Sequence, residues 1–166
     1  MQIIQASLKD IPAIREIVDI TWPVTYGEIL SAEQMEYMIS KFYSEKLLAE
    51  QMQHPGHTFM LAEEDGIVYG FAGIQFDYPE KGTTKLHKIY ILPAAQGKNT
   101  GRKLIEHITS LAKAAGQSSL LLNVNRFNRA RFFYEKIGFS VLKEEDVAIG
   151  EGYLMEDYVM ILIFDF

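Results

Sequence analysis

The sequence contains no cysteine, and this absence excludes several kinds of chemistry at once. A chain of 166 residues without cysteine can form no disulfide bond, no thiolate metal site and no thiol nucleophile. The sequence also lacks an apolar run of the length that a membrane-spanning helix requires. Because no basic region followed by a long apolar stretch stands at the N-terminus, we expect no signal peptide and a cytoplasmic protein.

Basic residues are outnumbered by acidic ones, 16 to 22, which gives a net charge of −6. An acidic protein repels phosphate backbones, so we expect no nucleic-acid partner, while a cationic substrate is compatible with this charge. Apolar residues make up 48% of the chain, as is typical of a globular protein. With no internal repeat and no linker, the length predicts a single domain over residues 1–166.

The first third of the chain has the periodicity of helices. A strand is expected over residues 2–7, and helices are expected over residues 8–22, 31–42 and 44–53. Ser31 and Gln34 have the spacing of a capping box at the start of the second helix. His54-Pro55-Gly56 should end the third helix.

The rest of the chain alternates between strands and helices. A hairpin is expected over residues 57–78, a strand over 83–92, a helix over 102–116, a strand over 118–125, a short helix over 128–139, and two final strands over 139–145 and 157–164. Hairpins combined with strand–helix–strand units predict a mixed α/β sheet with helices on both faces.

The stretch "LPAAQGKNTGRKLI", residues 92–105, joins an expected strand to an expected helix through two glycines and an asparagine. The first amides of a helix have no internal partner, and the helix dipole adds about half a positive charge there. An anion satisfies both needs, and small residues let it approach the backbone. The stretch has neither the Walker A spacing nor the dinucleotide GxGxxG pattern. It is therefore either a phosphate-binding turn or an ordinary turn between strand and helix.

A second candidate lies in "LLLNVNRFNRARFFYEKIGF", residues 120–139. One face of its short helix carries Ala130, Phe133, Tyr134 and Ile137. Tyr134 should therefore point inward, with a hydroxyl group that needs a partner. Asn128 suits the N-cap position. The pair is either a core tyrosine with a capping asparagine or part of a functional site.

Together, the two stretches resemble the GNAT superfamily of N-acetyltransferases. The phosphate-binding pattern of that family, Gln/Arg-x-x-Gly-x-Gly/Ala, reads Gln96 to Gly101 here, with Asn99 in place of the first glycine. Asparagine is one of the few other residues that tolerate a positive φ, so the turn can still form. The C-terminal "GYLMEDYVMILIF" is similar to the last strand of the family. The resemblance covers essentially the whole chain and implies a mixed, mostly antiparallel sheet of about seven strands with helices on both faces.

By this resemblance, the chain is an acetyl-CoA-dependent N-acetyltransferase that needs no metal. The pantetheine arm would pair with the backbone of β-strand residues as an added strand does, and the diphosphate would lie on the turn that follows. The cofactor-binding residues implied are Ile89, Tyr90, Ile91, Gln96, Gly97, Lys98, Asn99, Thr100, Gly101, Arg102, Asn128 and Phe133.

The resemblance also implies direct transfer of the acetyl group to a primary amine. Tyr134 is the expected acid, because a phenol is protonated at neutral pH and this one would face the sulfur. His87 stands where many relatives carry a glutamate, and histidine titrates in the range that suits a base. The alternative is that His87 is only a half-exposed strand residue, and Glu145 and Asp157 are other candidates for the base.

The acceptor pocket is expected near "TWPVTYGEIL", residues 21–30. Trp22 and Tyr26 would line the pocket and Glu28 would attract a cation, since aromatic rings suit an amine. The alternative is that Trp22 only closes the core face of the first helix. The region resembles bacterial members that act on small amines or polyamines, and a peptide amine is equally open.

Two other readings remain open from the sequence. One is a catalytically idle module that binds CoA and acts through protein contacts, and the other is a nucleoside-triphosphate binder. Tyr134 and the nearly complete phosphate pattern favour the enzyme. No membrane partner is expected, and a homodimer formed through the final strand is left open.

Overall fold

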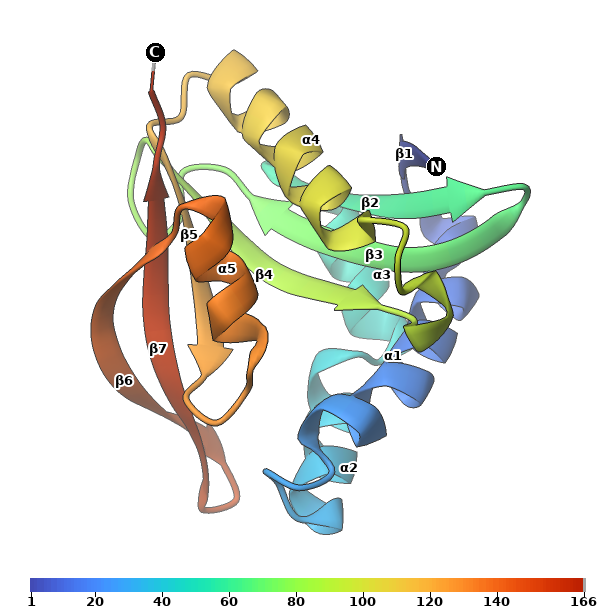
Figure 1. Ribbon diagram of the computed structural model, residues 1–166. Helices are drawn as coiled ribbons and strands as arrows, with labels where there is room; N and C mark the ends of the chain where they lie inside the picture. The colour runs from blue at the N-terminus through green and yellow to red at the C-terminus, as the bar shows by residue number, and fades with distance from the viewer. Residues whose placement is uncertain (166) are drawn as a thin grey trace.

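The computed structural model describes residues 1–165, which form one seven-stranded sheet in the order β1-β2-β3-β4-β5-β7-β6 (Figure 1). The strands are β1 (Gln2–Gln5), β2 (His57–Glu64), β3 (Ile67–Gln75), β4 (Thr83–Ile91), β5 (Ser119–Asn125), β6 (Ser140–Gly150) and β7 (Tyr153–Ile163). The α-helices are α1 (Ile11–Tyr26), α2 (Ala32–Phe42), α3 (Glu45–Gln53), α4 (Thr100–Ala114) and α5 (Ala130–Ile137). Two short 3₁₀ helices, η1 (Leu8–Asp10) and η2 (Pro93–Ala95), precede α1 and α4.

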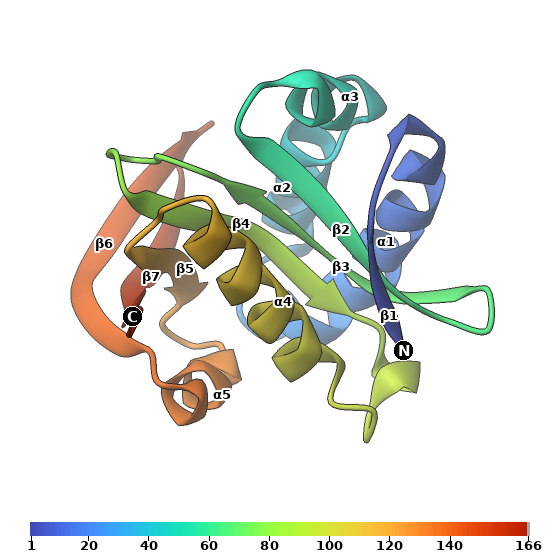
Figure 2. The same ribbon diagram turned by 90° about the horizontal axis from the view of Figure 1, so that it is seen from above.

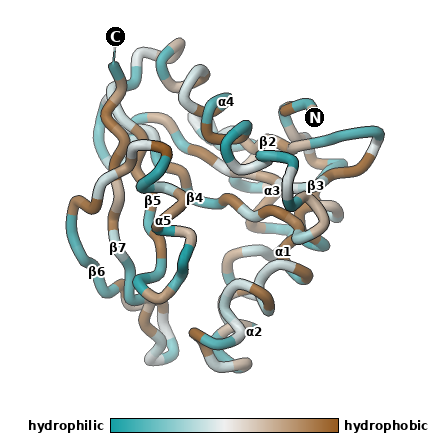
Figure 3. Tube along the Cα trace, viewed as in Figure 1, coloured by the Kyte–Doolittle hydropathy of each residue, from teal (hydrophilic) through white to brown (hydrophobic). Residues whose placement is uncertain are grey.

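The helices cover both faces of the sheet, as the sequence predicted. Figures 1 and 2 show α4 lying across one face, while α1, α2 and α3 lie on the other. One apolar core joins α4 and α5 to the sheet, and a second core joins the sheet to α1, α2 and α3. Along α4, hydrophilic and hydrophobic residues alternate, as expected for a helix with one buried face (Figure 3).

The sheet opens at its centre, between β4 and β5. These two strands are parallel, whereas all other neighbouring strands are antiparallel. They pair only from Thr83 to Leu86 on β4 and from Ser119 to Leu122 on β5. Beyond these residues the strands diverge, as Figure 1 shows. The backbone of the last part of β4 therefore lacks a neighbouring strand on its β5 side.

Helix α1 is longer than the sequence predicted. The predicted helix ends at residue 22, but α1 continues through Pro23 to Tyr26. Proline costs the helix one amide donor, but its carbonyl still accepts a hydrogen bond from the amide of Gly27, at 3.0 Å. Tyr26 consequently stands on a helix and not on a loop.

The capping box predicted for α2 forms only in part. The hydroxyl of Ser31 accepts a hydrogen bond from the amide of Gln34, at 3.1 Å. The side chain of Gln34 instead donates to the carbonyl of Leu154 on β7, at 2.9 Å. A long-range contact has replaced the second bond of the box, and it ties α2 to the end of the sheet.

The final strand cannot form the edge of a dimer, because β7 is flanked by β5 on one side and by β6 on the other. The edges of the sheet are β1 and β6. The sequence-based idea that a dimer could form by pairing of the last strand is therefore wrong, because β7 already pairs with β5 and β6.

Candidate active site

The turn between β4 and α4 has the backbone that the sequence pattern predicted. Gly97 has a φ of +85°, and Asn99 has a φ of 56° and a ψ of 31°, in the left-handed region. Asparagine tolerates this region through its short polar side chain. Asn99 therefore fills the place of the glycine in the family pattern without changing the course of the chain.

The amides of this turn point to an external acceptor. Within residues 1–165, no protein group accepts a hydrogen bond from the amides of Gly97, Asn99, Thr100, Gly101 or Arg102. The Asn99 side chain makes no capping bond to the helix. The Thr100 hydroxyl is buried and also has no partner. Unpaired donors at a helix start bind an anion well, because they and the helix dipole act together.

A hollow of about 530 Å³ adjoins these amides. It is bordered by the turn, by Ile91 at the end of β4 and by Phe133 on α5. A Cβ atom at Gly101 would lie 2.9 Å from Phe133 Cζ and 3.1 Å from Ile91 Cδ1. A larger residue at position 101 would therefore displace the tips of these two side chains, which border the hollow.

Two other residues of the predicted phosphate loop have protein partners. The Lys98 amide donates to the carbonyl of Ala95 at 3.1 Å, and its ammonium contacts a Glu64 carboxylate oxygen at 2.7 Å. The Gln96 amide donates to the carbonyl of Pro93. The contacts of Lys98 thus hold the turn against the β2–β3 hairpin. The unpaired amides of the turn belong to the residues before and after Lys98.

Tyr134 borders a cavity of about 170 Å³ at the opening between β4 and β5. Residues 86–91 of β4 and Asn128 line the same cavity. The rings of Phe133 and Phe139 pack against that of Tyr134, with centroids 5.4 and 5.7 Å away. Burial raises the pKa of the Tyr134 phenol above its ordinary value of 10. The hydroxyl therefore stays protonated at neutral pH and is available as a proton donor.

Asn128 lies just before α5, and the N-cap residue of the helix is Arg129, not Asn128 as the sequence predicted. The side-chain oxygen of Asn128 instead accepts a hydrogen bond from the amide of Ala130, the first residue of the helix, at 2.9 Å. This bond closes a turn of three residues, which shifts the start of the helix by one residue. Asn128 also lines the cavity at Tyr134.

His87 occupies a bulge in β4. Gly73 on β3 pairs with Lys88 and Ile74 pairs with Leu86, so His87 is the extra residue between them. A bulge changes which way the following side chains point. As a result, Leu86 and Ile89 face the core beneath α4, while Lys88 lies against Tyr43 on the opposite face.

The environment of His87 favours its neutral form. Although the residue is exposed as a whole, its ring lies between those of His57 and Tyr78, with centroids 5.7 and 5.2 Å away. Its Nε2 atom lies 2.9 Å from the side-chain oxygen of Gln75. Shielding from water, followed by the charges of Lys88 and other neighbours, lowers the His87 pKa from 6.5 to about 3.

A second chamber, of about 250 Å³, lies on the α1 side of the opening. Tyr26 and Tyr90 line both this chamber and the cavity at Tyr134, and their hydroxyl oxygens are 3.1 Å apart. Trp22 packs on Tyr26 with ring centroids 4.7 Å apart and is itself 2% exposed. Trp22 belongs to the core of α1, as one of the two interpretations held, and it also lines the chamber, so its role towards an acceptor stays a prediction.

Glu28 lies elsewhere. It borders a separate hollow together with Phe127 and Arg129, and the structure does not bring it to Trp22 and Tyr26. The acidic residue that does line the chamber is Asp157, on β7. The loop after α1 therefore contributes no carboxylate to the chamber.

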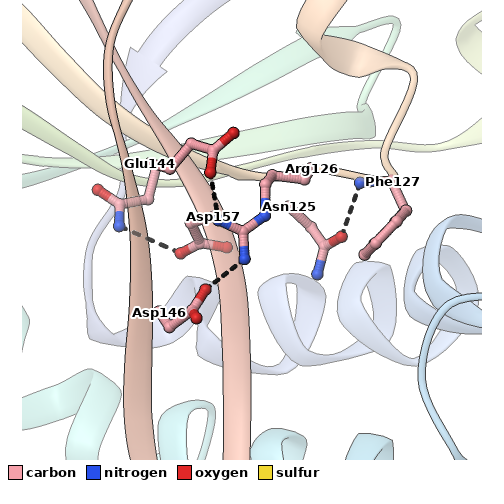
Figure 4. A network of polar contacts seen from close by, with 7 residues as sticks. Asn125, Arg126, Phe127, Glu144, Asp146 and Asp157 are labelled. Carbon is pink, nitrogen blue, oxygen red and sulfur yellow. Dashed lines mark hydrogen bonds and ion pairs between the residues drawn. The ribbon is translucent and has the colours of Figure 1, made fainter.

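Asp157 is buried, and only one of its oxygens is satisfied. Asn123 donates to Oδ2 at 3.1 Å, whereas Oδ1 has no partner among residues 1–165. Burial raises the Asp157 pKa above 3.8. Figure 4 shows Asp157 beside a polar cluster in which Arg126 joins Glu144 and Asp146.

Sequence reasoning missed Lys88 and Tyr43 as residues of the site. The Lys88 ammonium lies 4.7 Å from the centroid of the Tyr43 ring, and both line the chamber. Regular alternation would place Lys88 on the same face of β4 as Leu86, but the bulge at His87 places it on the opposite face, against Tyr43. Glu145, the remaining candidate for a base, pairs with Asp157 between β6 and β7, and its Oε2 atom accepts a hydrogen bond from Nδ2 of Asn123 at 3.4 Å.

Comparisons with known proteins agree with this geometry. Residues 28–161 match the family model of the acetyltransferase (GNAT) domain. The chain is 30% identical to a spermidine N(1)-acetyltransferase of Thermoplasma acidophilum over 161 residues, 94% of this chain and 96% of that protein. It is 33% identical to an IAA acetyltransferase of Azospirillum brasilense over 123 residues, 71% of this chain and 80% of that protein.

A similar solved structure is that of the PaiA N-acetyltransferase from Thermoplasma acidophilum in complex with coenzyme A. Its TM-score is 0.84 at 26% sequence identity, over 98% of each chain. The family model and these relatives define an acyltransferase, and the chain belongs to the GNAT family of acetyltransferases. It is an acetyl-CoA-dependent N-acetyltransferase. Within residues 1–165, every helix is too short or too polar to pass through a lipid bilayer.

Proposed function

We propose that the protein transfers an acetyl group directly from acetyl-CoA to the primary amine of a small acceptor, without a covalent enzyme intermediate. The observation that carries this proposal is that two cavities at the β4–β5 opening share lining residues. Tyr134 lines the first cavity, the second cavity is the aromatic chamber, and Tyr26 and Tyr90 line both. An acyl donor and an amine held on the two sides would meet at the opening, and proximity supplies much of the rate gain.

The free amides of the turn and the Thr100 hydroxyl suit the diphosphate of acetyl-CoA. The unpaired side of β4 at residues 89–91 suits its pantetheine arm, which carries peptide-like groups. Bound acetyl-CoA would supply a thioester at the opening. The amide of Ile91 would donate to the thioester carbonyl oxygen as negative charge develops on it.

Tyr134 would act as the acid. As the carbon–nitrogen bond forms and the carbon–sulfur bond breaks, its hydroxyl proton passes to the departing sulfur, whose thiol has a pKa of about 8.5. The amine must lose one proton in the same reaction. That proton returns through water to the phenolate, and the proton that an acceptor ammonium loses before attack passes through the base to solvent, so that the enzyme regains its starting state.

The base remains a choice between two residues of the chamber. His87 is neutral at pH 7 and can pass a proton on, but its low pKa makes it a weak acceptor. Burial raises the pKa of Asp157, which makes its carboxylate a stronger base than that of an exposed aspartate. Both line the chamber in which the amine would lie.

Thiol release from acetyl-CoA, measured over a panel of amines, amino acids and peptides, tests the proposal. Tyr134→Phe should lower kcat by about 10²- to 10⁴-fold and leave CoA binding intact, because only the proton donor is removed. Tyr158→Phe is the matched control, since this hydroxyl lies outside both cavities. Full activity of the Tyr134 variant would remove the acid from the mechanism.

A thermal melt separates the enzyme from its alternatives. CoA should raise the melting temperature by several degrees, because ligand linkage adds about 2–4 kcal/mol at saturating concentrations. Stabilisation by CoA without turnover of any acceptor would favour the idle binding module. Stabilisation by ATP in place of CoA would indicate a nucleotide binder.

A further inference from the structure

The chamber lined by Trp22, Tyr26, Tyr43, Tyr90, Lys88 and Asp157 contains two charged groups of opposite sign that do not satisfy one another. No salt bridge within 4 Å joins Lys88 to Asp157 in residues 1–165, although both border the same chamber of about 250 Å³. Burying a charged group without a partner is costly, so each of the two is suited to a ligand group of opposite charge.

Lys88 is the cationic side of the chamber. It is 9% exposed, and its ammonium makes no hydrogen bond within the described residues. Its contact in the protein is the face of the Tyr43 ring, 4.7 Å from the centroid. Removal from water lowers its pKa from 10.5 to about 8, and no neighbouring carboxylate raises it. A carboxylate of the acceptor would supply the missing counter-charge.

Asp157 is the anionic side. Its Oδ2 accepts from Asn123 at 3.1 Å, while Oδ1 is buried and has no partner. Asn123 lines the chamber as well and is held in turn by Lys85. One carboxylate oxygen is thus fixed by the protein and the other is left for a donor from outside.

One of the aromatic rings of the chamber already has a cation beside it. The face of Tyr43 is already occupied by the protein's own Lys88. A polyamine would bring further positive charge towards that ammonium, and like charges repel in a poorly solvated chamber. The chamber therefore discriminates against acceptors that carry only positive charge.

We infer that the chamber recognises an acceptor bearing both a carboxylate and an ammonium group, as an amino acid does, with the carboxylate against Lys88 Nζ and the ammonium against Asp157 Oδ1. This inference rests on the proposed function, since it names the class of acceptor for that reaction. It places the specificity in two residues outside the phosphate turn.

The test compares acceptors that differ only in the carboxyl group. A panel of L-amino acids and ω-amino acids is screened first, and each is paired with its amide and with the amine that lacks the carboxyl group, such as leucine with leucinamide and isopentylamine. The wild-type kcat/KM should favour the free acid of the best pair by about 10- to 100-fold, as expected for a hydrogen bond between charged groups.

Variants locate the preference. Lys88→Met should reduce the ratio of kcat/KM between acid and matched amine by about 10- to 100-fold, and Lys88→Arg should keep most of it. Asp157→Asn should raise KM for the acid, with CoA still raising the melting temperature as a check of folding. Lys46→Met and Asp19→Asn, both at exposed positions, are the matched controls.

The outcomes are distinct. Equal kcat/KM for acid and amine, spermidine as the best acceptor, or an unchanged ratio in Lys88→Met would overturn the inference and leave the proposed function standing. The absence of turnover with every acceptor would overturn the proposed function, and the inference with it.

Discussion

Replacing Lys88 by methionine should make the protein more stable, because the native state buries this ammonium without a counter-charge. The Lys88 pKa falls from 10.5 to about 8 on folding. At about 1.4 kcal/mol per pKa unit, this difference corresponds to an upper limit of about 3 kcal/mol at pH 7. Methionine has a similar length but loses the contact with the Tyr43 ring, which is worth about 1 kcal/mol. We expect a net gain of about 2 kcal/mol in the free energy of unfolding.

The pH dependence has a definite sign. Between pH 8 and 10.5 the unfolded chain binds more protons at this lysine than the folded protein does, so the stability of the wild type rises with pH in that window. Below pH 8 the full penalty is present. The advantage of Lys88→Met should therefore be largest at pH 7 and should fall by about 2 kcal/mol, almost to zero, by pH 9.5.

Urea denaturation at pH 7 and pH 9.5 measures both quantities. The control is Lys46→Met, at an exposed position of α3, which should change the free energy of unfolding by less than about 0.5 kcal/mol. A Lys88→Met protein that is less stable than the wild type at pH 7, or whose advantage is the same at both pH values, would refute this reasoning. A gain in stability with a loss of acceptor preference would mark Lys88 as a residue kept for function.

Three further predictions concern the turn and the bulge. Asn99→Val should lower the free energy of unfolding by about 1–2 kcal/mol, because a β-branched residue is strained at a φ of 56°. Asn99→Gly should not lower the free energy of unfolding, because glycine adopts this φ without strain. Urea denaturation of the two variants measures the difference. Thr100→Val should increase the free energy of unfolding by about 1 kcal/mol, since it removes a buried hydroxyl that has no partner among the described residues. The same substitution should weaken CoA binding several-fold, as measured by calorimetry. Unchanged affinity would mean that the hydroxyl does not contact the cofactor. Because the surroundings lower the pKa of His87 to about 3, its titration should not affect kcat/KM near pH 6.5, so the wild type and His87→Gln should have the same pH profile in that range. A transition near pH 6.5 that is present in the wild type and absent from His87→Gln would show that the ring is more basic than its surroundings indicate.

The backbone of the turn between β4 and α4 could be predicted from the sequence because its signals are local. Small residues between a strand and a helix require positive φ at particular positions, and Gly97 and Asn99 adopt it. The inward position of Tyr134 was likewise predictable from the spacing of apolar residues along one helix. In both cases the residues that decide the outcome lie within a few positions of one another.

The chamber could not be predicted in the same way. Strand alternation places Leu86 and Lys88 on the same face of β4, but the bulge at His87 separates them. Helix α1 was expected to end before Pro23, and its continuation brings Tyr26 to the opening. The significance of Asp157 depends on strand β7 lying beside β5, which places it next to Asn123. These are contacts between distant segments, and they leave no local pattern in the sequence.

The most direct test of the account is a crystal structure of the protein with coenzyme A. The account predicts diphosphate oxygens within about 3.2 Å of the free amides at Gly97 and at residues 99–102, with the sulfur facing Tyr134. A diphosphate bound elsewhere, or these amides occupied by the protein's own side chains in the complex, would contradict it.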